Sequence, residues 1–194
     1  MHDDTHKNKG TITAINNSSE SVFRLIDISM LTYETNFNSI NQKLNYYVRN
    51  KKILSPRRGI YTKLNYSYEE LANKIYTPSY ISLEYVLIKN GIISQNKETV
   101  TSVCYLSRQI EVDNKTFSYH KLKKEILANP LGIKRINNTN IAKPERAFLD
   151  LLYLGKKYDF KNLDTLNKTV IAKILPIYKS NKLSKLVKNI LQND

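Results

Sequence analysis

The residues most able to do chemistry form a run of cations in the stretch Thr35–Lys63. This stretch contains seven Lys and Arg side chains and no Asp or Glu. A run of that length with one sign of charge suggests a surface that faces a polyanion. An apolar pattern runs through the same residues, which indicates a folded segment. The cations are Lys43, Arg49, Lys51, Lys52, Arg57, Arg58 and Lys63.

The first half of the stretch predicts an amphipathic helix that begins at Thr35 or Asn36, both acceptable N-cap residues. Its apolar residues recur at spacings of three and four and so share one face. Asn, Gln and Arg on the other face can bind base edges, while Lys and Ser can bind phosphates. An ordinary helix with a solvated polar side would show the same pattern. The apolar positions are Phe37, Ile40, Leu44, Tyr47 and Val48, and the polar ones are Asn36, Ser39, Gln42, Lys43, Asn45, Tyr46 and Arg49.

The second half predicts a β-hairpin, which favours the nucleic-acid interpretation. Ile53-Leu54 leads into a turn with Pro and Gly, and Ile60–Thr62 returns. Arg57 and Arg58 at the tip can reach a phosphate backbone or a minor groove. A helix followed by a two-stranded wing is typical of winged helix-turn-helix DNA-binding domains. The predicted DNA-binding residues are Ser39, Gln42, Lys43, Tyr46, Arg49, Lys51, Lys52, Arg57, Arg58 and Lys63.

Composition supports a folded chain with an acidic partner. The formal net charge is +14 and the pI is near 9.7. Proteins with such a charge usually bind nucleic acid, an acidic membrane surface or an acidic protein. The apolar fraction of 41% is enough for a core. No apolar run approaches the ~20 residues of a membrane span, and no signal-peptide core follows Met1. The single cysteine, Cys104, excludes an internal disulfide framework. We therefore expect a cytoplasmic protein.

We predict an α+β chain in three parts: a flexible N-terminus (1–10), a winged helix-turn-helix domain (11–76) and a mixed domain (77–194). Upstream of the basic helix, Val22–Leu25 could be helical, or a short strand before a helix at Ile26–Leu31. The mixed domain is expected to hold one small antiparallel sheet with flanking helices. Its predicted helices are Tyr80–Asn90, one that begins at Pro144, one through Leu163–Ile174 and a last one after Lys182; its predicted strands are 99–107, 108–122 with a turn at Asp113–Lys115, and Gly132–Ile136.

Catalytic chemistry has little support in the sequence. The five glycines do not cluster into a phosphate-binding loop. His120 is the sole histidine outside the terminus and lies in a predicted strand, and Cys104 is expected to be a buried thiol. Arg146 and Asp150 are spaced to pair across one helical turn, worth about 0.3–0.5 kcal/mol if exposed. We predict no catalytic or metal site and no cofactor; acids that could serve a metal nuclease are Glu111, Asp113, Glu145 and Asp150.

Together, several segments resemble the AbiEi antitoxins of type IV toxin–antitoxin systems, across residues 20–155. They are VFRLIDISML, YYVRNKKIL, SPRRGIYTK, IYTPSYISLEYVLIKNGII and IAKPERAFLDLLYLG. The resemblance implies a winged helix-turn-helix that binds inverted repeats at its own promoter, and a mixed α/β domain required for antitoxicity. It implies a functional pairing with an AbiEii-like nucleotidyltransferase toxin. Because two copies on an inverted repeat would bind cooperatively, we expect a dimer on DNA. The positions that carry over as DNA-binding are Lys43, Arg49, Arg57 and Arg58.

Two alternatives remain open at this point. One is a metal-dependent nuclease that its N-terminal module delivers to DNA. The other is a protein-binding surface for an acidic partner, formed by the basic C-terminal helices with Lys182, Lys185 and Lys188. Lysines in that pattern are also typical of a solvated helix face.

Overall fold

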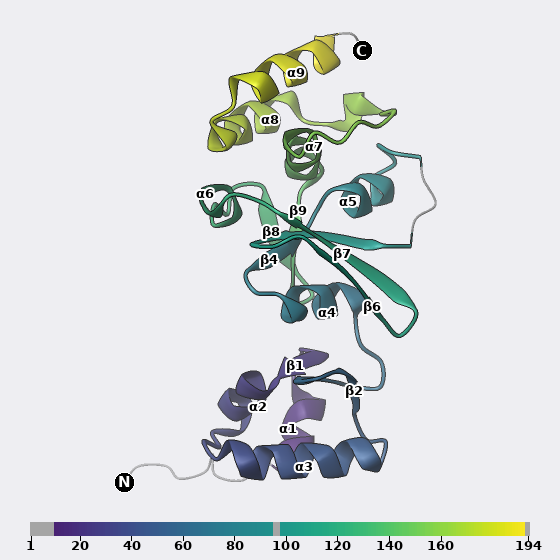
Figure 1. Cartoon of the computed structure of the whole chain (residues 1–194), viewed down its shortest axis with the longest axis vertical. Helices are drawn as coiled ribbons and strands as arrows, with labels where there is room; N and C mark the ends of the chain where they lie inside the picture. Colours follow the sequence, from purple (N-terminus) through teal and green to yellow (C-terminus); the bar gives the residue numbers. More distant parts are fainter. Residues whose placement is uncertain (1–9, 95–97, 193–194) are drawn as a thin grey trace. The chain divides into compact units, whose positions relative to one another are not determined.

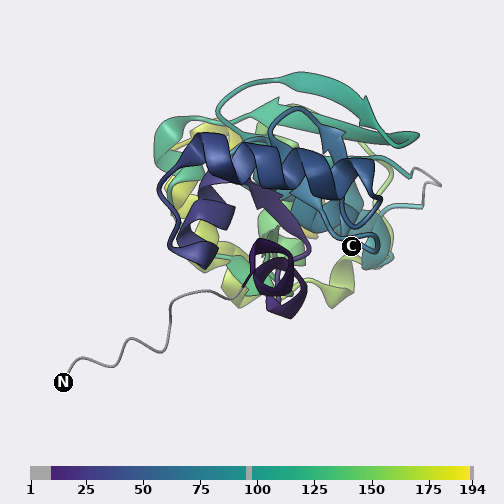
Figure 2. The same ribbon diagram turned by 90° about the horizontal axis from the view of Figure 1, so that it is seen from below.

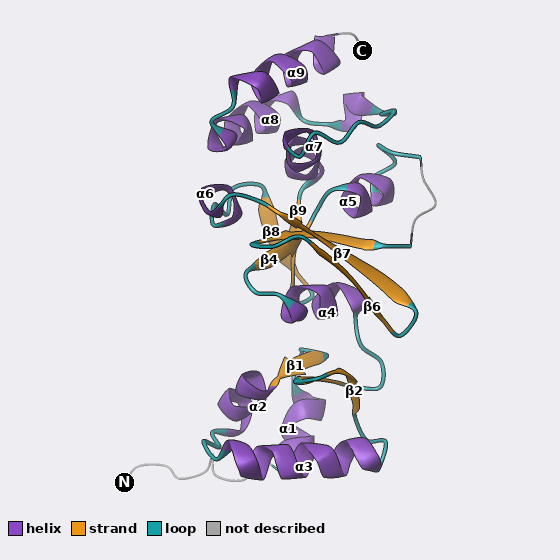
Figure 3. Ribbon diagram, viewed as in Figure 1, coloured by secondary structure: helices purple, strands orange, loops and turns teal. Residues whose placement is uncertain are grey.

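The structure, a computed structural model, describes residues 10–94 and 98–192. The flexible N-terminus expected at residues 1–10 therefore lies outside the described residues, apart from Gly10. The chain divides into two compact units, Met1–Ile75 (unit 1) and Tyr76–Asp194 (unit 2). The described residues form nine α-helices, a three-stranded antiparallel sheet and a six-stranded mixed sheet (Figure 1, Figure 3). The predicted α+β class is confirmed.

The sheet of unit 1 has the strand order β1-β3-β2, with antiparallel pairing throughout. Strand β1 (Val22–Arg24) precedes a helix, so the second of the two alternatives for this segment is correct. The predicted hairpin is also present: β2 (Leu54–Arg57) and β3 (Ile60–Thr62) are joined by Arg58 and Gly59. Gly59 has a φ of 78°, a conformation that favours glycine. The helices are α1 (Thr11–Asn17), α2 (Leu25–Thr32), α3 (Phe37–Arg49) and α4 (Tyr68–Ile75).

Helix α3 is positioned by its cap and by its apolar face. The Asn36 side chain accepts hydrogen bonds from the backbone N–H groups of Asn38 and Ser39, both at 3.1 Å, so it is the N-cap. Ile40 and Leu44 are completely buried, whereas Phe37, expected on the buried face, is 43% exposed. The core of unit 1 consists of Ile15, Phe23, Ile28, Ile40, Leu44, Ile53 and Tyr61.

Helix α4 is fixed to the rest of unit 1 by charged side chains. The buried Glu70 carboxylate accepts hydrogen bonds from the backbone N–H groups of Ser21 and Val22 and from the Ser21 hydroxyl. One turn later, the Lys74 ammonium pairs with Glu20 at 2.9 Å and with Asp27 at 3.0 Å. These contacts fix α4 against the start of β1 and against α2.

Unit 2 contains a six-stranded sheet in the order β6-β7-β5-β4-β9-β8. The expectation of a small antiparallel sheet is wrong, because β5 pairs with β7 and β4 with β9 in parallel. The β6–β7 hairpin around Asp113-Asn114 is present as predicted. Turn residues identify neighbours in sequence but not these long-range pairings. The strands are β4 (Ser79–Ile81), β5 (Val100–Cys104), β6 (Arg108–Val112), β7 (Lys115–Lys121), β8 (Ile133–Ile136) and β9 (Thr139–Ala142).

Two predicted helices of unit 2 differ from the structure. Tyr80 and Ile81 are not helical but form β4 inside the sheet, where they are 2% and 0% exposed. A short apolar run fits a buried strand as well as a helix. The helix expected through Leu163–Ile174 is a 3-10 turn followed by α8. The helices are α5 (Glu84–Lys89), α6 (Lys124–Leu127), α7 (Pro144–Tyr153), α8 (Lys168–Ile174) and α9 (Asn181–Gln192), with 3-10 segments η1 (Leu163–Thr165) and η2 (Leu175–Tyr178).

Helices α5 to α9 lie on one side of this sheet, with α8 and α9 outside α7 (Figure 1). Helix α7 contacts α5, α8 and α9. It begins at Pro144, as expected for proline at a helix start. Helix α7 is therefore enclosed on several sides, and its residues from Glu145 to Leu152 are all buried.

Candidate nucleic-acid interface

The exposed side of α3 carries a row of polar side chains. Asn38, Gln42, Asn45 and Arg49 are spaced by three or four residues, so they lie along one line of the helix, and all four are exposed. Figure 2 looks onto this helix from below. Asn, Gln and Arg are the side chains that form paired hydrogen bonds with base edges. The 13 residues of α3 span about 20 Å, long enough to follow a DNA groove over several base pairs.

A second row on α3 contains Ser39, Lys43 and Tyr46. Its cation is paired: Lys43 Nζ lies 2.7 Å from Glu34 Oε2, in the turn before the helix. Hydrogen bonds from Lys43 and then Ser39 lower the pKa of the Glu34 carboxyl. Two predicted DNA-binding residues, Ser39 and Lys43, therefore face a carboxylate of their own chain. Tyr46 is 57% exposed.

The hairpin tip presents two arginines to solvent. Arg57 is half-buried at the end of β2 and Arg58 is exposed in the turn. The Ser55 hydroxyl donates to the Ile60 carbonyl at 3.2 Å and so bridges the two strands. Within residues 10–94 and 98–192, neither arginine makes an ion pair, and the same holds for Arg49. These guanidinium groups are available to an external anion.

The remaining predicted cations differ in their surroundings. Lys51 is exposed and follows α3 with a φ of 52°. Lys52 Nζ lies 6.0 Å from the ring centres of both Tyr46 and Tyr47, at the outer limit of a cation–π contact. Lys63 Nζ donates to the carbonyls of Asn16 and Ser18, at 3.1 and 2.6 Å. Lys63 therefore stabilises the C-terminal end of α1, where a cation is favourable.

The acids of unit 1 leave this surface positive. Between residues 10 and 75 there are five acidic residues, and all lie outside the stretch Thr35–Lys63. Each has an internal partner, in Lys74, Arg24, Lys43, Ser67 or the start of β1. Among residues 10–75, Glu34 is the acid that lies against the α3 face, where it pairs with Lys43. The acids are Glu20, Asp27, Glu34, Glu69 and Glu70.

Asn38 and Asn45 are absent from the residues predicted to bind DNA. They complete the exposed row that Gln42 and Arg49 begin. The signal was present in the sequence, since both lie at helical spacings from Gln42. The engagement of Lys43 and Lys63 by groups of unit 1 could not be read from spacing, because Lys63 contacts residues 45 and 47 positions away.

The acids that might serve a metal nuclease do not converge in the described part of the chain. Glu111 and Asp113 are exposed on the β6–β7 hairpin, whereas Glu145 and Asp150 are buried on α7. Among residues 10–94 and 98–192, no three His, Cys, Asp or Glu side chains are grouped as metal ligands would be. The Glu145 carboxylate accepts a hydrogen bond from the Asn167 backbone N–H at 3.2 Å.

The Arg146–Asp150 pair is a buried ionic network rather than the exposed pair the spacing suggested. Both side chains have no exposed surface, and Arg146 Nε lies 3.3 Å from Asp150 Oδ1. Burial raises the pKa of the Asp150 carboxyl, which the Arg146 charge opposes. The hydroxyls of Tyr178, Ser82 and Tyr80 donate to Asp150, at 2.6, 2.8 and 3.0 Å. Arg146 also donates to the carbonyls of Leu131 and Ile126.

A second cluster of titratable groups lies around Glu84, at the start of α5. Its carboxylate accepts hydrogen bonds from Lys156 and from the Tyr158 hydroxyl. Burial would raise the pKa of Glu84, but these hydrogen bonds outweigh it and the pKa lies below its ordinary value. Burial and then the Lys156 charge lower the pKa of His120, whose Nε2 is 3.2 Å from Lys156 Nζ. Burial and the bond to Glu84 raise the pKa of Tyr158 to about 12. Sequence spacing did not reveal this cluster.

No family model matches the chain, and no curated protein matches it. As for membranes, none of the helices in residues 10–94 and 98–192 has the length and apolar character needed to cross a bilayer.

Proposed function

We propose that this protein is a DNA-binding transcriptional autorepressor and the antitoxin of a type IV toxin–antitoxin system, acting in the cytoplasm. The order of elements in unit 1 supports the first half of the proposal. Three helices, a first strand after α1, and a final hairpin with strand order β1-β3-β2 are the arrangement expected of a winged helix-turn-helix. The turn between α2 and α3 is short, and the Ser29 hydroxyl donates to the Glu34 carbonyl within it.

The observation that carries the proposal is the polar face of α3 together with Arg57 and Arg58, which make no ion pair with any residue that the structure describes. In the proposed complex α3 lies in the major groove, whose width of about 12 Å accepts a helix. Gln42, Asn45 and Arg49 then contact base edges. Arg57 and Arg58 contact the adjacent backbone or minor groove. Phosphate contacts fix the register, and base contacts select the sequence.

Repression follows from occupancy in this proposal. Two copies on an inverted repeat would place their α3 helices about 34–36 Å apart, one turn of DNA, and would cover the promoter. The antitoxin half rests on the resemblance of residues 20–155 to the AbiEi antitoxins. It assigns neutralisation of an AbiEii-like nucleotidyltransferase to the second unit.

A binding titration tests the DNA half. Fluorescence anisotropy would compare the protein's own upstream DNA with a scrambled duplex over a range of salt concentrations. We expect tighter binding to the upstream DNA. Arg57→Ala with Arg58→Ala should weaken binding to both duplexes and reduce the salt slope by about two. The matched control is Lys123→Ala with Lys124→Ala, two adjacent exposed lysines of unit 2. Equal affinity for both duplexes, or equal effects of the two double variants, would refute the proposed interface.

The antitoxin half has its own readout. Growth would be measured in cells that express an AbiEii-like nucleotidyltransferase toxin together with the wild type or the Arg57→Ala, Arg58→Ala variant. We expect both to restore growth, because neutralisation is assigned to unit 2 and promoter binding to unit 1. Failure of the wild type to restore growth would remove the antitoxin assignment and leave the DNA half standing.

A further inference from the structure

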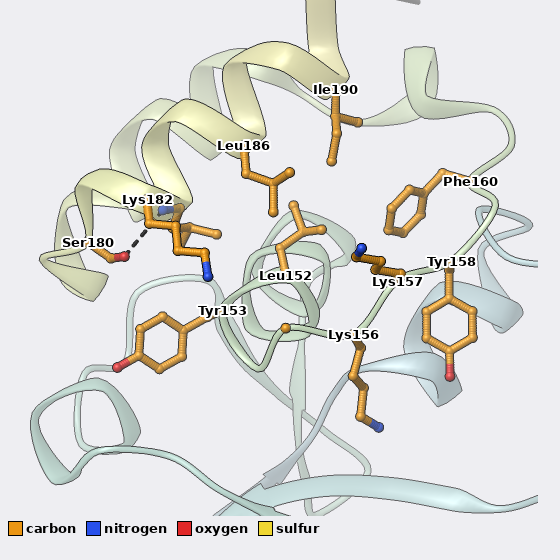
Figure 4. A pocket seen from close by; sticks show the side chains of 12 residues that line it. Leu152, Tyr153, Lys156, Lys157, Tyr158, Phe160, Ser180, Lys182, Leu186 and Ile190 are labelled. Atoms are coloured by element: carbon orange, nitrogen blue, oxygen red, sulfur yellow. Dashed lines mark hydrogen bonds between the residues drawn. The ribbon is translucent and has the colours of Figure 1, made fainter.

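Unit 2 contains a cavity that the proposed function does not use. It lies between the end of α7, the segment 155–160 and α9, and has a volume of about 610 Å³. Small-molecule sites in proteins typically have volumes of about 300–1,000 Å³. The residues that line it are Leu152, Tyr153, Gly155, Lys156, Lys157, Tyr158, Phe160, Ser180, Lys182, Leu183, Leu186 and Ile190 (Figure 4).

The apolar part of the cavity arises from the way α9 packs. Leu183 and Val187 are buried, whereas Leu186 on the neighbouring row is 37% exposed. Lys182, Leu186 and Ile190 are four residues apart and so form one line along the cavity. Leu152 of α7 and Phe160 of the following loop complete its apolar surface. A leucine left partly uncovered over such a space is available to an apolar ligand.

The charged part of the cavity has one sign. Three of the lining residues are lysines, and none of the lining residues that the structure describes is acidic. Lys156 is already paired with Glu84 and points away from α9 in Figure 4. Lys157 and Lys182 are both exposed, and in the described part of the chain neither makes an ion pair. In Figure 4 they lie on either side of Leu152.

We propose that this cavity binds a small amphipathic anion, namely a fatty acid of medium chain length. The alkyl chain would lie against Leu152, Phe160, Leu186 and Ile190. Its carboxylate would face Lys157 and Lys182. Lysine ammonium groups are compact charges on flexible stems, which suits a head group that requires no fixed two-point geometry. Burial of an alkyl chain contributes most of the binding free energy, and the charges select an anion over a neutral or cationic chain.

The test uses the full-length protein with decanoate and decyltrimethylammonium below their micelle-forming concentrations, and with decanol below its solubility limit. Methyl NMR would report which side chains respond, and titration would give each Kd. We expect decanoate to shift the methyl signals of Leu152, Leu186 and Ile190 and leave those of Ile28 and Leu44 in unit 1 unchanged. Decanol should bind about fivefold to tenfold more weakly, and the cation more weakly still. Shifts spread over both units, no binding of decanoate, or equal affinity for the cation would overturn the proposal.

Two charge-reversal variants separate this site from the general positive charge of the protein. Lys157→Glu with Lys182→Glu should weaken decanoate binding and leave decanol binding unchanged. The control, Lys185→Glu with Lys188→Glu, changes exposed lysines of α9 that do not line the cavity and should affect neither ligand. Leu186→Trp should reduce binding of both ligands by filling the cavity. Circular dichroism confirms that each variant is folded. If the control pair weakens decanoate as much as the first pair, the lysines of the cavity are not its site.

Discussion

Helices α3 and α7 use charged side chains in opposite ways. On α3, Arg49 and Lys43 lie in solvent, and the buried face is apolar. On α7, Arg146 and Asp150 have no exposed surface and are bonded to tyrosines and backbone carbonyls. A charge in water can be given to a ligand at little cost to the fold, whereas a buried charge must keep its partners. The surroundings of a charged side chain, and not its residue type, therefore decide whether it can bind a ligand or must stabilise the fold.

The largest effect should come from breaking the buried pair. Asp150→Ala leaves the Arg146 guanidinium buried without its counter-ion, which costs about 3–5 kcal/mol. Hydrogen exchange of the α7 and β4 amides would measure the loss. The exposed Asp159→Ala serves as the control and should change the free energy by less than about 0.5 kcal/mol. Arg146→Met with Asp150→Leu should recover part of the loss, because no charge is then left unpaired. Equal stability of the Asp150→Ala and Asp159→Ala variants would contradict the claim that the buried Arg146 depends on Asp150.

The substitution Lys156→Met should lower the free energy of unfolding by an amount that depends on pH. The pKa of Glu84 in the folded state lies below its ordinary value of 4.5, so its ionised form stabilises the fold above that value. Without Lys156 the carboxylate stays buried with one partner fewer, which costs about 2 kcal/mol at neutral pH. As the pH falls through 4.5 and below, protonation of Glu84 removes the stabilisation from the wild type, and the difference should shrink. Urea unfolding at pH 7 and pH 4 would measure it. A difference that grows towards acid pH would have the wrong sign.

The exposed face of α3 should affect binding but not folding. Arg49→Ala or Gln42→Ala should cost about 1–2 kcal/mol in binding to the upstream DNA and much less in binding to a scrambled duplex. The thermal unfolding midpoint should stay unchanged, because both side chains are exposed. Anisotropy and circular dichroism would check the two expectations. A fall in the unfolding midpoint would show that these side chains stabilise the fold, as Arg146 and Asp150 do on α7.

The smallest effect is expected at Glu34. Glu34→Gln removes the carboxylate that pairs with Lys43 and accepts from Ser39. Folding should change little, because the pair is exposed. Binding to any duplex should strengthen slightly, with a salt slope larger by up to about one, since Lys43 becomes free to contact a phosphate. The same anisotropy titration measures this, and weaker binding would show that Glu34 does not compete with DNA for Lys43.

Local sequence patterns predicted much of the secondary structure of unit 1. Asn36 as one of two predicted N-caps, Ile40 and Leu44 as buried positions and Gly59 in the hairpin turn each depend on residues a few positions apart. Such features are governed by helix period, capping and turn chemistry, which a sequence displays directly. The α+β class followed from the same signals. The winged helix-turn-helix interpretation and the DNA-binding residues remain predictions.

Tertiary structure alone decided which charges are buried and which strands are neighbours. Arg146 and Asp150 have the spacing of a surface pair, but they are enclosed because Tyr80, 66 residues from Arg146, and Tyr178, 28 residues from Asp150, pack against them. The parallel pairing of β5 with β7 likewise could not be predicted from turn residues, because no tight turn joins these two strands. The amino-acid sequence by itself determined the helix and hairpin of the stretch Thr35–Lys63 and the positive charge of that stretch. Burial and strand pairing depend on distant residues coming together, so they were fixed only when the chain folded.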